Sequence, residues 1–271
     1  MNWQAIAQND LRKAIHERGA WALFAGFFLG FGGLAALLVQ LGGPEFEGYI
    51  DLLAPGVGLL VPLAGIILGY EAIIGERESG TAVLSLSMPH SRAGLIVGKL
   101  VGRTTLLATV IAAAALLASV ILLYFFPSFS ASRFVGFTAM SIVYGTTFLW
   151  IAAGLSMTLS TSRRVIAAAF GAYIGLTLFW TVLIDLTETV LFRFRPTSGE
   201  PETWVTLASF VGPNTSFNYV LAEVLDAGTV PAAVVDSSAN FVTPVVALLA
   251  LVGWAILPVL GGFLSFRQDD L

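Results

Sequence analysis

The chain has 271 residues, of which 57% are apolar and only 11% are charged, and its mean hydropathy is +0.87. A soluble core of this length cannot hold so much apolar surface, so the composition excludes an ordinary soluble domain and predicts an all-α polytopic membrane protein. The net charge of −4 disfavours nucleic-acid binding, and the absence of cysteine excludes disulfides and thiolate metal sites.

Residues 2–18 form the first predicted element. Trp3, Ile6 and Leu11 recur at helical spacing, with polar and charged residues on the opposite face. This pattern predicts an interfacial amphipathic helix, lying at the membrane surface. Its polar stretch and the apolar run that follows are both too long for a secretory signal, so the helix is expected to be retained.

Six apolar segments follow, each long enough to cross about 30 Å of hydrocarbon at about 1.5 Å per residue. No internal repeat divides the chain, so residues 1–271 are expected to form a single transmembrane domain. The expected spans are 20–41, 53–75, 101–126, 134–160, 165–190 and 243–266.

Lysine and arginine are distributed unevenly between the two sides of these spans. Ten fall on the side of the termini and three on the other. The positive-inside rule therefore predicts a plasma-membrane protein with both termini in the cytoplasm. The opposite side holds segment 191–242, which is too apolar for a disordered tail and is expected to form short extracellular helices before the last span.

Segment 76–100 is the predicted cytoplasmic coupling segment. A short helix from Thr81 to Ser87, ended by Pro89, would be rigidly joined to two spanning helices and could transmit a push from a soluble partner into the membrane. A mixed-charge face would meet that partner. The residues expected to couple the chain to an ATPase are Glu76, Arg77, Glu78, Gly80, Thr81, Pro89, Arg92 and Lys99.

The pair Gly98-Lys99 does not make a phosphate loop. That motif needs four residues between its glycines and a hydroxyl residue after the lysine, whereas Gly94 is one residue too near and Leu100 follows Lys99. We therefore expect no catalytic residue and no cofactor in this chain. If the protein uses ATP and magnesium, a separate subunit binds them.

The stretch from Gly69 to Thr81, with Pro89, Arg92, Gly98 and Lys99 at the following spacing, resembles the permease subunits of type-2 ABC exporters. It is most similar to the branch that includes the permease of nitrous-oxide reductase maturation systems. The resemblance implies a homodimer of two permease copies. It also implies that the first cytoplasmic loop and the amino-terminal helix dock on a separate pair of ATPase subunits.

Three ionisable residues are expected within or near the spans: Glu71, Asp185 and Glu188. Burial of Glu71 would cost about 2–3 kcal/mol without a partner, so we expect an ion pair with Arg103, Arg163 or Arg164. Asp185 and Glu188 share a helical face near the outer end of the fifth span and are expected to be solvated.

Small residues recur at helical spacing in three places: Gly26/Gly30, Gly94/Gly98/Gly102 and Gly171/Gly175. Such pairs allow close helix packing, either within the chain or at a dimer seam.

The alternative function is an ion- or proton-coupled carrier acting without an ATPase. Its ionisable residues would be Glu71, Asp185 and Glu188, yet all three lie near span ends, and no interrupted pair of helices is evident. Soft-metal transport lacks converging ligands, because the two histidines are isolated. An intramembrane protease would need polar catalytic groups at membrane depth, and neither histidine falls inside a span.

Overall fold

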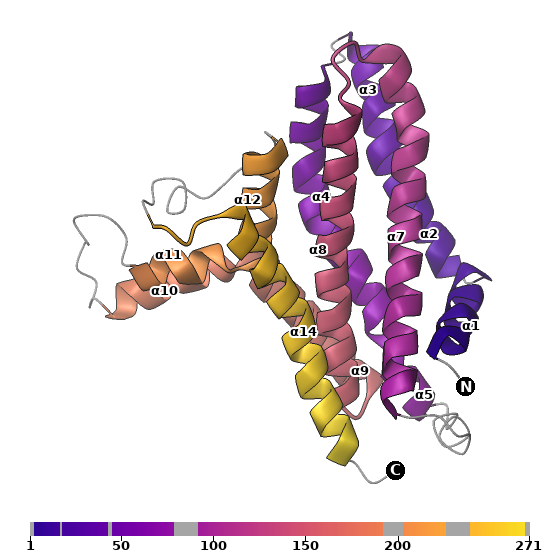
Figure 1. Ribbon diagram of the computed structural model, residues 1–271, viewed down its shortest axis with the longest axis vertical. Helices are drawn as coiled ribbons and strands as arrows, with labels where there is room; N and C mark the ends of the chain where they lie inside the picture. The colour runs from indigo at the N-terminus through magenta and orange to yellow at the C-terminus, as the bar shows by residue number, and fades with distance from the viewer. Residues whose placement is uncertain are drawn as a thin grey trace.

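The computed structural model describes residues 3–16, 18–42, 45–78, 92–191, 203–225 and 239–268. All regular structure in these ranges is helical, as the composition predicts (Figure 1). The helices are α1 (Trp3–His16), α2 (Arg18–Phe28), η1 (Leu29–Gly33), α3 (Leu34–Leu41), α4 (Phe46–Gly69), α5 (Glu71–Glu78), α7 (Arg92–Phe125), α8 (Ala131–Thr158), α9 (Ser162–Tyr173), η2 (Ile174–Leu178), α10 (Trp180–Leu191), α11 (Thr203–Phe210), α12 (Pro213–Leu225) and α14 (Pro244–Gln268).

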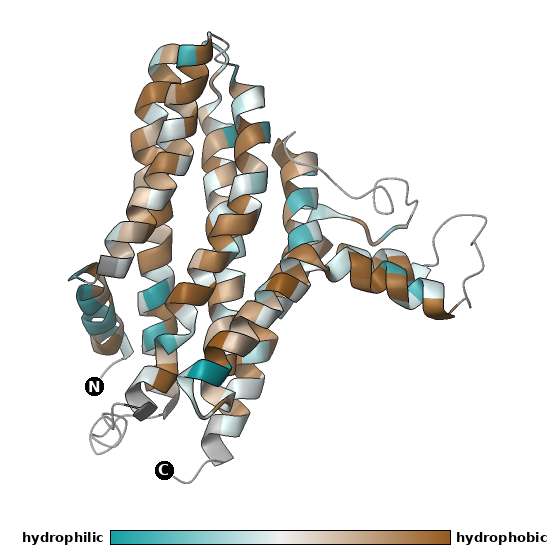
Figure 2. Ribbon diagram, turned by 180° about the vertical axis from the view of Figure 1, so that it is seen from behind, coloured by the Kyte–Doolittle hydropathy of each residue, from teal (hydrophilic) through white to brown (hydrophobic). Residues whose placement is uncertain are grey.

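Five helical stretches are long and apolar enough to cross a membrane, and a sixth is a bent pair. The first combines α2, η1 and α3, and ends at Gly42, whose φ of 79° terminates the helix in the left-handed region. Figure 2 shows hydrophobic colouring along most of the bundle, with hydrophilic colouring on α1 and at scattered positions on other helices. The prediction of a multi-pass helical membrane protein is therefore confirmed.

Helix α8 lies at the centre of the bundle, packed against α4, α7 and α14. Glycines bring the backbones together, because a Cβ at Gly65 of α4 would lie 2.3 Å from the Gly145 carbonyl oxygen of α8. A Cβ at Gly262 of α14 would lie 2.5 Å from the Gly154 carbonyl oxygen. Close backbone approach of this kind is the main source of packing between helices surrounded by lipid.

The fifth expected span, 165–190, is interrupted. Residues Ser162–Leu178 and Trp180–Leu191 form two helices bent by 72° at Phe179, and α10 projects away from the bundle (Figure 1). The expectation that no interrupted helix pair exists is wrong at this position. Before the bend, η2 is a π-helix, a form that often accompanies kinks and functional sites.

Contacts with residues distant in the sequence stabilise this bend. The indole Nε1 of Trp180 donates to the Ala208 carbonyl oxygen at 2.8 Å, and a Cβ at Gly212 would lie 2.2 Å from the Trp180 ring. The carbonyl of Thr177, in the last turn of η2, accepts a hydrogen bond from Asn214 Nδ2 at 3.3 Å. Because α11 and α12 supply these partners, local sequence alone does not reveal the break.

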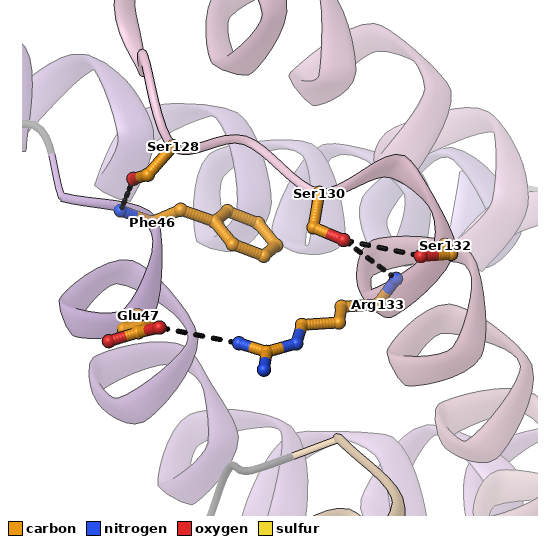
Figure 3. Close-up of polar contacts among 6 residues, drawn as sticks. All are labelled: Phe46, Glu47, Ser128, Ser130, Ser132 and Arg133. Carbon is orange, nitrogen blue, oxygen red and sulfur yellow. Dashed lines mark hydrogen bonds and ion pairs between the residues drawn. The ribbon is translucent and has the colours of Figure 1, made fainter.

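The end of the bundle opposite the termini is fastened by polar contacts between the start of α4 and the turn between α7 and α8 (Figure 3). Ser128 Oγ accepts from the Phe46 amide at 3.2 Å, and Arg133 pairs with Glu47 at 3.3 Å. Ser130 caps α8 by accepting from the Arg133 amide at 3.5 Å. The Glu47 side chain is 75% exposed, so this ion pair is well solvated.

Candidate functional site

The ends of the predicted coupling segment lie at the same end of the bundle as the two termini (Figure 1). Glu76 and Arg77 belong to the last turn of α5, which ends at Glu78, and Arg92 is the first residue of α7. Gly80, Thr81 and Pro89, with the predicted short helix, lie outside the described residues. The described backbone thus joins the segment to the short helix α5 on one side and to the long helix α7 on the other.

Helix α1 is seated on the lower part of α7 through glycines. A Cβ at Gly98 would lie 2.8 Å from both the Ile6 Cβ and the Trp3 carbonyl oxygen. At Gly102 a Cβ would lie 2.9 Å from the Ala7 carbonyl oxygen. Two members of the Gly94/Gly98/Gly102 series therefore serve packing within the chain. Gly26, Gly30, Gly171 and Gly175, by contrast, have open space where a Cβ would stand.

Arg103 ties three elements together. Its Nε lies 3.5 Å from Oδ2 of Asp10 in α1, and its Nη1 donates to the Leu68 carbonyl oxygen near the end of α4. The two side chains are only 18% and 15% exposed, so water screens this ion pair much less than it screens the pair at the opposite end. Arg103 thus links α7 to α1 and to the end of α4.

Glu71 lies in the same region but has a different partner from the one expected. Its Oε1 accepts a hydrogen bond from the Tyr70 hydroxyl at 2.6 Å. Among the described residues, the ion-pair partner of Arg103 is Asp10 rather than Glu71. Residue spacing did not indicate this pair, because Asp10 and Arg103 lie far apart along the chain and only the packing of α1 on α7 brings them together.

Ser156 of α8 fastens α5 to the centre of the bundle. Its Oγ accepts from the backbone amides of Ile73 and Ile74, at 3.2 and 2.9 Å. The first amides of a helix have no partner within the helix, so this hydroxyl completes the start of α5 in place of a local cap.

We call this meeting of α1, the α4–α5 junction, the lower part of α7 and Ser156 the basal joint. It encloses a cavity of about 340 Å³. Charges of both signs line it: Asp10, Lys13, Glu71, Lys99 and Arg103. Among the described residues no group of three or more His, Asp or Glu side chains could hold a metal.

Lys99 is 7% exposed and lines this cavity. In the single chain it does not lie on the open face expected of a residue that touches a soluble partner. Asp185 and Glu188 lie on α10, beyond the bend, and Asp185 is exposed. Because α10 projects away from the bundle, the structure does not bring these two residues near Glu71 (Figure 1).

The long apolar helices define a multi-pass helical membrane protein. The chain belongs to the ABC-2 family of transporter proteins, whose family model matches residues 4–271. It is thus a membrane permease of the ABC transporter class, as the coupling-segment residues indicated.

Two relatives place the chain within this family. It is 31% identical, over 191 residues and 67% of each chain, to the probable ABC transporter permease protein NosY of Pseudomonas aeruginosa. It is 24% identical, over 270 residues and 97% of each chain, to the protein of the same name from Stutzerimonas stutzeri. The branch expected from the sequence is confirmed.

Proposed function

We propose that the chain is the membrane-spanning half of an ATP-driven exporter, acting as a homodimer with a separate pair of ATPase subunits. ATP and magnesium bind to those subunits, and no covalent chemistry takes place in this chain. Closure of the ATPases pushes on segment 76–100, and the spans then switch access from the cytoplasm to the outside. In this arrangement the protein lies in the plasma membrane with both termini in the cytoplasm.

The observation that carries this proposal is the three-way attachment of Arg103. A coupling element has to be stiff and continuous with the helices that it moves. Arg92 begins a helix of 34 residues, about 51 Å long, which exceeds the roughly 30 Å hydrocarbon layer, so the base of α7 extends beyond it. Arg103 and the contact of Gly98 and Gly102 with α1, which we call the glycine seat, tie this base to α1 and α4. One push therefore reaches all three helices.

A solitary carrier is the weaker proposal. It requires ionisable groups gathered at one depth in the membrane. The three expected groups are instead divided between α5 and α10. Family membership also favours a permease that works with an ATPase.

The test is co-purification of the tagged full-length protein with its candidate ATPase under mild detergent. Reversal of charge by Glu76→Lys together with Glu78→Lys should remove the ATPase, because the mixed-charge face at the end of α5 would then repel its partner. The control is Glu45→Lys, an exposed acid just before α4 at the opposite end of the bundle. If wild type recovers no ATPase, or if both variants recover it equally, the coupling proposal fails.

A further inference from the structure

A second cavity, of about 560 Å³, lies away from the basal joint between α4, η2 and α12. Its polar lining consists of Asp51, Gly58, Thr177, Asn214 and Asn218. We call it the polar cavity. It adjoins the bend at Phe179, the one place where a predicted span is interrupted among the described residues. Irregular backbone at membrane depth is tolerated where it is buried in protein or lines an aqueous cavity.

Residues whose backbone carbonyls lack their usual helical donors line this cavity. Pro55 and Pro62 have no amide hydrogen, so the carbonyl four residues before each lacks its helical donor. Those carbonyls belong to Asp51 and Gly58, which both line the cavity, and the Gly58 carbonyl accepts instead from the Tyr144 hydroxyl at 3.5 Å. A third carbonyl, that of Thr177, lies in the last turn before the bend. Interrupted helices with released carbonyls are a known way of binding cations inside membrane proteins.

The side-chain donors around the cavity are largely engaged by protein acceptors. The Tyr144 hydroxyl donates to Asn214 Oδ1 at 3.3 Å, and Asn214 Nδ2 donates to the Thr177 carbonyl. Asn218 Nδ2 donates to the Asn214 carbonyl at 2.9 Å and to Asn214 Oδ1 at 3.1 Å. The groups that remain available are therefore mainly acceptors.

Thr177 gives a second, independent sign of a ligand. The residue is 7% exposed, and its Oγ1 is buried with no hydrogen bond of ordinary geometry in the described structure, although it interacts with the Tyr144 hydroxyl. A buried hydroxyl left without a partner costs about 1–3 kcal/mol, so such groups are rare unless a ligand or water meets them. Asp51 brings the only charge in the cavity lining, and it is negative.

The geometry points to a small protonated organic amine as the occupant. Its ammonium group would donate to the Asp51 carboxylate, Thr177 Oγ1 and the Asn218 side-chain oxygen. A single carboxylate among neutral oxygens suits one positive charge. The volume lies within the range of small-molecule sites and far exceeds that of a bare ion, while Leu59 and Leu178 offer an apolar wall for an alkyl group. The statement that this amine is transported rests on the proposed function. The statement that it binds in the polar cavity does not.

The test uses the purified full-length protein in detergent without ATPase, with butylamine as the probe at neutral pH. Butylamine should raise Tm in a concentration-dependent, saturable manner, and butanol at equal concentration should not. Asp51→Asn and Thr177→Val should each weaken the apparent affinity by about tenfold or more, because each removes an acceptor for a charged donor. Thr177→Ser, which keeps the hydroxyl, should retain binding, as should the control Glu45→Gln.

Three results would overturn the inference. Equal shifts with butanol would mean apolar partitioning, and full affinity in Asp51→Asn would exclude the carboxylate. A shift with sodium or potassium chloride but none with butylamine would assign the cavity to an inorganic ion. The butylamine test does not involve the ATPase, so the two proposals can fail separately. If the Glu76→Lys/Glu78→Lys variant binds butylamine and still co-purifies with the ATPase, only the coupling proposal is contradicted.

Discussion

The basal joint and the polar cavity share helix α4 but differ in what their polar groups contact. In the joint, Arg103 contacts Asp10 and the Leu68 carbonyl, and Ser156 accepts from two amides. Arg103 Nε and Asp10 Oδ2 form no hydrogen bond, but they face each other as an ion pair at 3.5 Å. In the cavity, the buried Thr177 Oγ1 forms no hydrogen bond of ordinary geometry in the described structure. We infer from this difference that the joint serves stability, whereas the cavity is where we propose that a ligand binds.

The largest effect is expected from Arg103→Met. The substitution leaves the poorly exposed Asp10 carboxylate without its ion-pair partner, and breaking a buried pair costs about 3 kcal/mol. We expect a clear fall in Tm and loss of ATP hydrolysis that depends on the permease. The double variant Asp10→Asn/Arg103→Met should recover much of the stability. If the single and double variants unfold alike, the pair contributes little.

The second effect tests the glycine seat. Gly98→Leu places side-chain atoms where α1 lies, so we expect a loss of about 1–3 kcal/mol and faster tryptic cleavage after Lys13. The matched control is Gly171→Leu, because a Cβ at Gly171 meets open space and leucine favours a helix over glycine. Equal cleavage rates in the two variants would show that α1 is not held by this contact.

A smaller loss is expected from Ser156→Ala. Two buried amides at the start of α5 lose their acceptor, at a cost of about 1–2 kcal/mol, and amide hydrogen exchange at Ile73 and Ile74 should accelerate. In the control Ser119→Ala, the lost hydroxyl bonds only to the Leu116 carbonyl of its own helix, so stability should hardly change. Unchanged exchange at both amides would contradict the capping role.

The smallest expected change is a gain in stability, whereas the three substitutions above lower it. Thr177→Val removes a buried hydroxyl without a partner and keeps its shape, so the ligand-free protein should be unchanged or stabilised by about 0.5–1 kcal/mol. Chemical or thermal unfolding without butylamine measures this. A marked destabilisation would mean that the hydroxyl already has a partner and would remove the contrast between the two regions.

Sequence patterns predicted the spans well and the contacts between them poorly. Hydropathy locates the long apolar helices, because a helix in lipid has to be apolar over its whole width. Glycine spacing alone did not distinguish Gly98, which packs against α1, from Gly171, which meets open space. That distinction depends on which helix lies opposite, and a single sequence does not contain this information.

The bend at Phe179 and the polar cavity escaped prediction for a related reason. No proline marks the break, which is held by Trp180 and by Asn214 from a later helix. Two signals were present in the sequence. Pro55 and Pro62 lie within an apolar span, and Asn214 and Asn218 stand one helical turn apart. Together they indicate a polar surface facing inward, although neither identifies its ligand.

The seat of α1 on α7 has a consequence for how such a protein diverges among its relatives. Gly98 and Gly102 meet the backbone oxygens of Trp3 and Ala7, which every amino acid supplies alike. The attachment therefore tolerates replacement of most outward side chains of α1. Substitutions on the outward face of α1 would leave both of these glycine contacts in place.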